Sequence, residues 1–391
     1  MGKSPIASLC ALAIVGGICL PLLAGCSTTA AGVRLRQVAE LKGSGVVAGD
    51  EFGTSVAISG ATAVVGSPGG AGRAYVFKKM ASGWSQVAEL KGSDATGGDH
   101  FGAAVGISGS TIVVGAYDQA KNAGRAYVFK KMASGWSQVG ELKASDTLAD
   151  DYFGWSVAIS GSSIMVGAVG HAKYTGSAYV FTRKASGWTQ TAELEGSGTT
   201  TEDGFGTSVG IVGTTAIVGA EGYAKGKGRA YVFTETGSGW TQAAELIAAD
   251  AVAGDNFGAS VAISPATAVV GAYGKASSAG RAYVFDHTGR GWEQGAELKG
   301  TDTIAGDYFG ISVAISGRFI VVGAYGGAKF AGRAYVFDHT GRGWEQTAEL
   351  KGSNTTAGDY LGVSVAISGT TTVTGAYDRA KETGAAYMFQ T

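Results

Sequence analysis

Short apolar segments separated by glycine-rich polar segments make up nearly all of this chain. Residues 101–142 show the pattern, with apolar and aromatic runs at 101–108, 111–116, 124–129 and 136–142. Runs of this length that are rich in β-branched and aromatic residues predict strands, and the Gly, Ser, Asn and Asp between them predict turns. No later stretch keeps a 3.6-residue apolar period, so we expect no helices of consequence.

The four runs recur with a period of about fifty residues. A Phe-Gly pair marks each copy, 49 residues apart for the first two copies and 52 residues apart after that, and Leu361-Gly362 marks a degenerate seventh copy. A fixed period of this length indicates one supersecondary unit repeated in space. Four strands in each of seven units predict an all-β fold, a seven-bladed β-propeller with four-stranded blades. An open β-solenoid is the alternative.

The two ends of the chain favour the closed ring. The last unit ends at Thr391 without its fourth run, the Trp-x-Gln-x-Ala-Glu-Leu motif. A matching run stands at the front of the repeats, at 35–41, with Leu35 in place of the Trp. If this N-terminal strand pairs into the last blade, it closes the ring and removes the exposed sheet edges. We therefore predict one propeller domain over residues 35–391.

The first 25 residues differ from the repeats and predict a lipoprotein signal peptide. A positive start at Lys3 precedes a mostly apolar, uncharged stretch at 6–24, and the Leu-Ala-Gly-Cys sequence at 23–26 resembles the bacterial lipobox. This resemblance implies lipidation of Cys26, a lipidated tether at 26–34, and a place in the bacterial cell envelope, exported and either periplasmic or surface-exposed. An uncleaved membrane anchor is the alternative, because the apolar run approaches spanning length.

Composition after the signal excludes several classes of protein. Lys3 is the only charged residue before Cys26, so the remaining chain holds 29 basic and 31 acidic side chains. That balance gives no electrostatic reason to bind nucleic acid. Cys10 and Cys19 would leave with the signal, which excludes a disulfide framework. We expect a monomer with a membrane partner through its lipid and no nucleic-acid partner.

The repeated motif resembles a known family. The succession Phe-Gly-x-Ser-Val-Ala-Ile-Ser-Gly, Val-Val-Gly-Ala and Gly-x-Ala-Tyr-Val-Phe is similar to the FG-GAP repeat, which occurs in the propeller of integrin α subunits and in many bacterial surface or periplasmic proteins. The resemblance covers 35–391 and implies binding rather than catalysis. Integrin-type repeats carry an Asp-rich calcium loop between their first two strands, where this chain has tight turns such as 108–111. We expect no cofactor and no metal site, although weak calcium binding stays open.

Most recurring side chains have structural explanations. We expect the Phe of each Phe-Gly pair to fill the space between adjacent blades, and the recurring Trp of the fourth run to cover the blade edge. Trp155 is the one Trp outside this register, and we assign it to packing. The Asp of Gly-Asp-x-Phe-Gly is expected to close a turn onto its own backbone. Paired carboxylates there could otherwise bind a cation or take part in acid–base chemistry.

The candidate binding residues lie in the loops between strands two and three. In a four-stranded meander these loops share a face with the interblade loops, and loops that carry aromatic and charged residues commonly bind ligands. Matching loop positions hold Tyr117, Lys121, Lys173, Lys225, Tyr273, Tyr325, Lys329, Tyr377 and Lys381, with Lys275 two places earlier in its own loop. The alternative is that the lysines only keep the loops soluble while the tyrosines pack against the next blade.

These observations predict a lipid-anchored interaction module of the cell envelope. We expect it to bind a protein or glycan through the face that carries the interblade and strand 2–3 loops. We assign no catalytic residues, so we do not expect an enzyme. The alternative is a polysaccharide-active enzyme that uses the interblade carboxylates.

Overall fold

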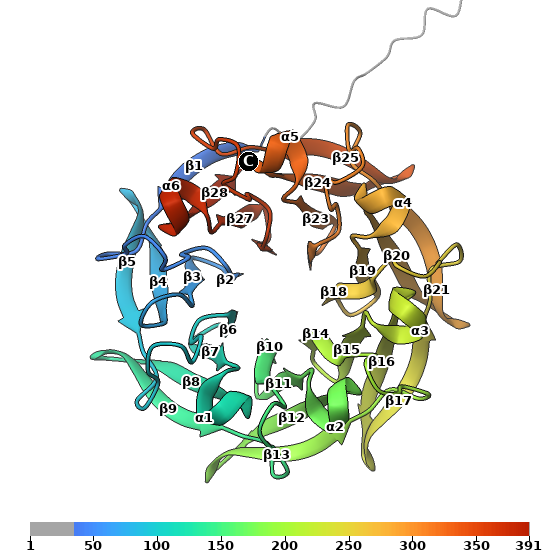
Figure 1. Cartoon of the computed structure of the whole chain (residues 1–391), viewed down its shortest axis with the longest axis horizontal. Helices are drawn as coiled ribbons and strands as arrows, with labels where there is room; N and C mark the ends of the chain where they lie inside the picture. The colour runs from blue at the N-terminus through green and yellow to red at the C-terminus, as the bar shows by residue number, and fades with distance from the viewer. Residues whose placement is uncertain (1–34, 391) are drawn as a thin grey trace, which may run out of the picture. The chain divides into compact units, whose positions relative to one another are not determined.

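The propeller predicted from the sequence is confirmed. The structure is a computed structural model that describes residues 35–390. These residues form seven four-stranded antiparallel sheets, which Figure 1 shows as blades around a central axis, with the first strand of each blade innermost. The predicted signal peptide at 1–25, Cys26 and the tether at 26–34 lie outside the described residues.

Each of the first six blades uses four consecutive strands, which follow one another from the axis outward. Blade 1 contains β2 (Val56–Ser59), β3 (Thr62–Ser67), β4 (Arg73–Met80) and β5 (Gly83–Leu90). Blade 2 contains β6 (Ala104–Ser108), β7 (Thr111–Ala116), β8 (Arg125–Met132) and β9 (Gly135–Leu142). Blade 3 contains β10 (Phe153–Ser160), β11 (Ser163–Ala168), β12 (Ser177–Lys184) and β13 (Gly187–Leu194).

The remaining blades repeat this order, except that blade 7 draws its outer strand from the front of the repeats. Blade 4 contains β14 (Phe205–Val212), β15 (Thr215–Ala220), β16 (Arg229–Thr236) and β17 (Gly239–Leu246). Blade 5 contains β18 (Phe257–Ile263), β19 (Thr267–Ala272), β20 (Arg281–Thr288) and β21 (Gly291–Leu298). Blade 6 contains β22 (Ser312–Ser316), β23 (Phe319–Ala324), β24 (Arg333–Thr340) and β25 (Gly343–Leu350). Blade 7 contains β26 (Val365–Ser368), β27 (Thr371–Ala376), β28 (Ala385–Gln390) and β1 (Arg36–Leu41).

Ring closure by the N-terminal strand is also confirmed. Strand β1 pairs with β28 in antiparallel register, from Arg36 opposite Gln390 to Leu41 opposite Ala386. The Gln37 side chain accepts a hydrogen bond at 2.8 Å from the backbone N–H of Ser353, which lies in the loop between blades 6 and 7. Glutamines at the matching positions of the other outer strands make the same contact to the loop that enters their own blade. The closing strand therefore reproduces the interblade bonding of the six other blades.

The Phe-Gly pair joins adjacent blades, as the sequence predicted. Phe101 is fully buried in a cluster that holds side chains of both blade 1 and blade 2. Gly102 follows it with a φ of +103°, and a Cβ atom there would collide with the Arg73 carbonyl oxygen of blade 1. Only glycine tolerates both this conformation and this approach. The pair therefore fixes the spacing of neighbouring blades.

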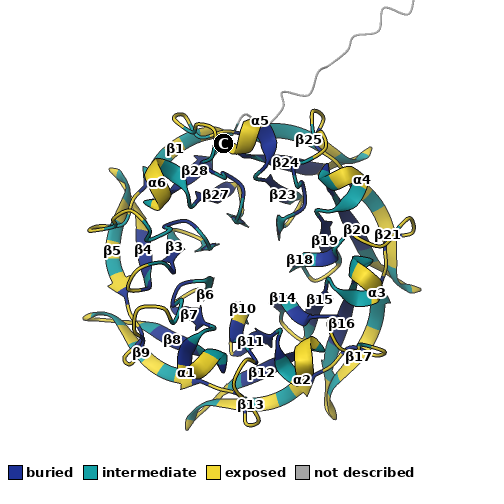
Figure 2. Ribbon diagram, viewed as in Figure 1, coloured by how far each residue is buried: buried dark blue, intermediate teal, exposed yellow. Residues whose placement is uncertain are grey.

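Burial is greatest in the middle of each blade. Figure 2 shows the second and third strands buried throughout the ring, whereas outer strands such as β5 and β13 alternate between exposed and partly buried positions. The recurring Trp lies on the outer strand, where Trp136 packs on the cluster between blades 1 and 2. This placement agrees with its predicted role at the blade edge.

Six short helical turns were not predicted. They are one turn each and connect the second and third strands of blades 2 to 7: α1 (Gln119–Asn122), α2 (His171–Tyr174), α3 (Tyr223–Gly226), α4 (Lys275–Ser278), α5 (Gly327–Phe330) and α6 (Arg379–Glu382). Blade 1 has a shorter connection without such a turn, which accounts for the 49-residue spacing of its Phe-Gly pair from the next. Within residues 35–390, no helix has the length and apolar composition that a membrane crossing requires.

Candidate functional site

The helical turns and the interblade loops share one face, as expected from the topology. In α1 the Asn122 carbonyl oxygen accepts a hydrogen bond from the Tyr152 N–H, which belongs to the loop entering blade 3. The matching bond recurs from the later turns to the next blade, for example from the Tyr360 N–H to the Phe330 carbonyl oxygen. Figure 1 shows the six turns distributed around this face. We call it the loop face.

The turns are left-handed at their centre. In α1, Ala120, Lys121 and Asn122 have φ values of 55°, 62° and 61°. Three successive non-glycine residues in this region are unusual, because the Cβ atom crowds the backbone there. The hydrogen bonds to the next blade hold this conformation, which directs the central residue of the turn outward.

The predicted lysines occupy that central position and are exposed, one in each of five blades: Lys121, Lys173, Lys225, Lys329 and Lys381. They are spread around the loop face and do not converge on one point (Figure 1). Lys275 behaves differently. Its ammonium group lies 3.0 Å from carboxylate oxygens of both Asp250 and Asp255, and only 14% of its side chain is exposed.

The predicted tyrosines of blades 5 to 7 are half-buried and pack against tyrosines in the entry loops of their own blade and of the next. Within one blade, Tyr325 stacks on Tyr308 at 4.9 Å between ring centroids, and Tyr377 stacks on Tyr360 at 5.3 Å. Across to the next blade, Tyr273 lies 6.2 Å from Tyr308, and Tyr325 lies 5.7 Å from Tyr360. The contacts with the next blade are the packing role that the sequence left open as an alternative. They also create an aromatic arc across blades 5 to 7.

The hydroxyls of Tyr273 and Tyr377 in this arc stay protonated at neutral pH. Burial raises the pKa of Tyr273 to about 12, and the negative charge of Glu221 adds to the increase. Burial likewise raises the pKa of Tyr377 to about 12, together with Tyr360 and Asp378. Each hydroxyl therefore remains available as a hydrogen-bond donor.

A second aromatic group forms at the mouth of the central channel. The channel contains a cavity of about 270 Å³ lined by three residues from every blade, and Trp155 of blade 3 is the only aromatic residue in that lining. The Trp155 side chain is 42% exposed and lies 4.9 Å from Tyr117, between ring centroids. Tyr152 and Tyr174 continue the group at 6.1 Å from each other. The sequence singled out Trp155 as out of register but assigned it only to packing.

This aromatic group borders a pocket between blades 3 and 4. The pocket has a volume of about 510 Å³ and is lined by Tyr152, Trp155 and Tyr174 on one side. Glu202, Glu221 and Asn256 provide its polar groups. Burial raises the pKa of Glu221, and a hydrogen bond with Tyr273 opposes the increase. We call this site the aromatic pocket.

The interblade carboxylates are engaged in structural hydrogen bonds. Seven aspartates accept a bond from the backbone N–H three residues earlier, at 2.6 to 2.9 Å: Asp50, Asp99, Asp151, Asp203, Asp255, Asp307 and Asp359. The predicted turn-closing role is confirmed. A second set, Asp94, Asp250 and Asp302, accepts bonds from buried tyrosine hydroxyls at 2.7 to 2.9 Å. These contacts give the recurring acids a structural role, because they fix the interblade loops.

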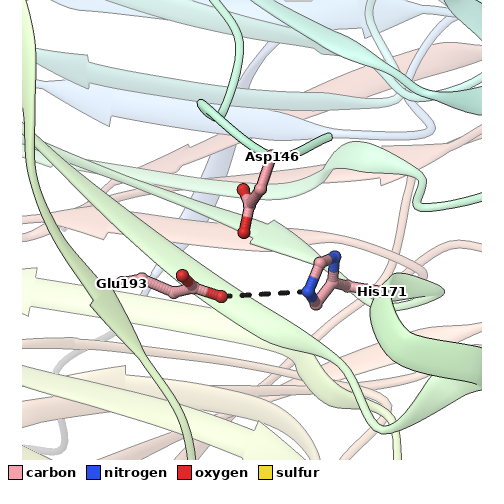
Figure 3. A group of neighbouring side chains, drawn as sticks. All are labelled: Asp146, His171 and Glu193. Atoms are coloured by element: carbon pink, nitrogen blue, oxygen red, sulfur yellow. Dashed lines mark ion pairs between the residues drawn. The ribbon is translucent and has the colours of Figure 1, made fainter. Parts of the chain in front are cut away.

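Blade 3 departs from this arrangement. Asp146, His171 and Glu193 come from an interblade loop, from α2 and from β13, and Figure 3 shows their side chains facing one another. One potential ligand atom of each lies within 4.8 Å of the others. These residues are far apart in the sequence, and their spacing matches no metal-binding motif, so no metal site was expected there.

The comparisons with known proteins bear on the fold and the family. The FG-GAP repeat matches residues 35–77, 84–129, 136–181, 188–233, 240–285, 292–337 and 344–389. A chain of a solved structure described as "Crystal Structure of Mitotic Checkpoint Complex" aligns with a TM-score of 0.60 and 13% identity, over 97% of this chain and 99% of that chain. At this identity the likeness concerns the fold alone. None of the curated proteins matches the sequence. With seven matched repeats that span the propeller, the chain belongs to the FG-GAP repeat family.

Proposed function

We propose that this protein is a non-catalytic binding module that takes a glycan on its loop face. The aromatic pocket carries the proposal. It combines an exposed Trp155 with two tyrosine rings and with carboxylate and amide groups around a volume of about 510 Å³. A pocket of this size with an apolar wall and a few polar groups is suited to a small molecule or a short chain segment.

The chemistry of the pocket favours sugar over protein. Aromatic faces offer an apolar surface to the C–H side of a sugar ring, while Glu202, Glu221 and Asn256 can bond its hydroxyls. Among the described residues, the pocket lining contains two acidic side chains and no Lys or Arg. An uncharged, hydroxyl-rich glycan therefore fits this pocket better than an anionic one. The exposed lysines of the turns lie outside the lining, where they can contact a longer chain.

Binding of the purified full-length protein to a panel of immobilised glycans tests this proposal. We expect Trp155→Ala to weaken retention at least about tenfold, a change of roughly 1.4 kcal/mol. The matched control is Met132→Ala. It truncates an exposed apolar side chain at the end of β8 that lies away from the loop face. Both variants should melt like the wild type, because surface substitutions usually change stability by less than about 0.5 kcal/mol.

Three outcomes would count against the proposal. Equal retention of Trp155→Ala and wild type would show that the aromatic pocket is not the binding site. Capture of a protein but no glycan, lost in Trp155→Ala, would support a protein ligand at the same site. Release of soluble sugar from a retained polysaccharide would support the enzyme alternative.

We further propose that the propeller is held at a bacterial membrane by a lipid on Cys26. The Leu-Ala-Gly-Cys sequence at 23–26 supports this placement. Two acyl signals anchor a protein stably where a single chain does not. Fatty-acid labelling and fractionation of cells that express wild type or Cys26→Ala test it. Absence of label in the wild type, with unchanged partitioning of the variant, would contradict it.

A further inference from the structure

One position of the loop face differs in every blade that has a helical turn. The first residue of the turn is Gln119, His171, Tyr223, Lys275, Gly327 or Arg379. In blade 5 this residue is a cation that neutralises the acids beneath it, since Lys275 contacts Asp250 and Asp255. In blade 7, Arg379 lies 3.6 Å from Glu40, which belongs to the outer strand rather than to an interblade loop. The residue at this position therefore determines which of the nearby acids is neutralised.

Blade 3 lacks the arginine that other blades use. In blades 1, 2 and 5 the first residue of the third strand is an Arg whose Nε lies 2.7 to 3.1 Å from the outer-strand Glu. Blade 3 has Ser177 there, which donates a hydrogen bond to Glu193 at 3.1 Å. Within residues 35–390, Glu193 is the outer-strand Glu of this series that contacts neither Lys nor Arg. His171 is its one basic neighbour in that range, with Nε2 3.9 Å from Oε1.

A second carboxylate orients the histidine. His171 Nδ1 lies 3.1 Å from Asp151 Oδ2, and the Asp151 carboxylate is itself held by the Leu148 N–H at 2.7 Å. This contact leaves Nε2 facing Glu193 and Asp146 (Figure 3). A histidine that binds a metal through one nitrogen commonly donates its other N–H to a carboxylate in this way.

The buried Tyr179 hydroxyl faces the same cluster. In blades 2, 5 and 6 the matching hydroxyl donates to the aspartate that corresponds to Asp146. Burial raises the pKa of Tyr179, and the charges of Glu193 and Asp146 add to the increase. The hydroxyl therefore stays protonated and can donate a hydrogen bond to Asp146 or to a water bound beside it.

We propose that Asp146, His171 and Glu193 form a binding site for a divalent first-row transition metal, with Zn²⁺ as the best fit. An imidazole nitrogen and two carboxylate oxygens suit zinc, which takes three protein ligands and a water where a site stays open. Calcium fits less well because it prefers oxygen ligands only. Ligand atoms up to 4.8 Å apart must approach one another by up to about 1.5 Å to reach tetrahedral zinc distances. The exposed side chains of Asp146 and Glu193 can do so by rotation.

Calorimetric titration of the tag-free, chelator-treated full-length protein with ZnCl₂, and separately with CaCl₂, tests the site. We expect one zinc per chain and weaker or absent calcium binding. His171→Gln removes a ligand and should lower zinc affinity about 100-fold or more. Asp151→Asn removes the negative charge that orients the histidine and should lower zinc affinity about 10- to 100-fold. His339→Gln is the control, since that ring packs on Trp344 in blade 6.

A further variant separates loss of the metal site from loss of the fold. Ser177→Arg restores the arginine of the other blades, which should pair with Glu193 and abolish zinc binding without lowering the melting temperature. The proposal is overturned if zinc binds wild type, His171→Gln and Ser177→Arg within a factor of three of one another. It is also overturned if wild type binds no zinc, or if His339→Gln loses zinc as fully as His171→Gln.

Discussion

Blades 3 and 5 share one backbone and the same interblade carboxylates, yet they neutralise these acids differently. In blade 5, Lys275 forms ion pairs with Asp250 and Asp255 at 3.0 Å. In blade 3 the equivalent residue is His171, and its neighbour Glu193 lacks the arginine that its counterpart in blade 5 has. In blade 5 the acids are neutralised by basic side chains of the protein, whereas in blade 3 the proposed metal ion would provide the missing positive charge.

The difference separates the repeated framework from the residues that vary upon it. Phe153 in blade 3 and Phe257 in blade 5 are equally buried and make nearly identical contacts, at 5.7 and 5.6 Å from the tyrosines Tyr179 and Tyr283. The framework therefore supplies stability in the same way in each blade. Within the helical turns, the first and fourth residues differ in all six blades, and this variation changes the surface without disturbing the core.

The largest expected effect tests whether the two frameworks are equivalent. Phe153→Ala and Phe257→Ala each remove a fully buried ring, and each should lower the free energy of unfolding by about 3–5 kcal/mol. Denaturant unfolding of the two variants beside wild type measures this. If one substitution lowers the free energy of unfolding by more than twice as much as the other, the cores of blades 3 and 5 are not equivalent.

A smaller effect is expected from the cation of blade 5. Lys275→Met should destabilise the protein by about 1–3 kcal/mol at pH 7, because Asp255 stays buried without its partner. In chelated buffer, His171→Met should cost less, since no ammonium group is removed there. Unfolding of both variants at pH 7 measures the difference, and an equal cost would mean that Lys275 contributes no more than His171.

The cost of Lys275→Met should depend on pH. Burial acts to raise the pKa of Asp250, but hydrogen bonds from Lys275 and Tyr283 outweigh it, and the pKa lies below the usual 3.8. Burial acts to lower the pKa of Lys275, but hydrogen bonds and charge interactions with Asp250 and Asp255 outweigh it and hold that pKa above 10.5. Because the pKa of Asp250 is lowered on folding, its ion pair stabilises the folded protein above pH 3.8, and this stabilisation is lost in acid. Because the pKa of Lys275 is raised on folding, its ion pairs stabilise the folded protein below pH 10.5, and this stabilisation is lost in alkali. The difference from wild type should therefore shrink below pH 4 and above pH 10.5.

The smallest effect on stability is expected from the exposed lysines. Lys121, Lys225 and Lys329 form no ion pair among the described residues, so their joint replacement by Glu should change stability by less than about 1 kcal/mol. If the loop face binds a long uncharged glycan, the triple variant should lower retention by a few-fold, because the lysine ammonium groups can donate hydrogen bonds to its hydroxyls. Replacement of Lys79, Arg183 and Arg290 by Glu on the opposite face is the control. An equal loss in both sets would contradict binding through one face.

The fold was predictable because its determinants repeat. Phe-Gly at a constant spacing identified the blades, and the run at 35–41 identified the closing strand. The helical turns were missed because Ala120 and Lys121 have no intrinsic preference for positive φ. The neighbouring blade imposes that conformation through hydrogen bonds that leave no trace in local sequence.

The candidate sites were predictable only in part. The sequence indicated the loop face and distinguished Trp155, but the exposure of this side chain at the channel mouth depends on the closed ring. The cluster of Asp146, His171 and Glu193 joins a loop, a turn and an outer strand, so no spacing pattern marks it. A signal did exist, because Ser177 interrupts the Arg that precedes Ala-Tyr-Val-Phe in the first six repeats. The residues that depart from the shared motif, such as Ser177, therefore indicate a candidate site better than the residues that all repeats share.

The pairing of β1 with β28 has a consequence for the order of folding. Strand β1 is made before every other strand of the propeller, whereas its partner β28 is made after all of them. Blades 1 to 6 can assemble one after another as the chain grows, whereas blade 7 must wait for both of its contributors. Until then β1 is an unpaired strand, and such strands associate readily with other chains. We therefore expect the moment of closure to be the stage at which this protein most needs protection from aggregation.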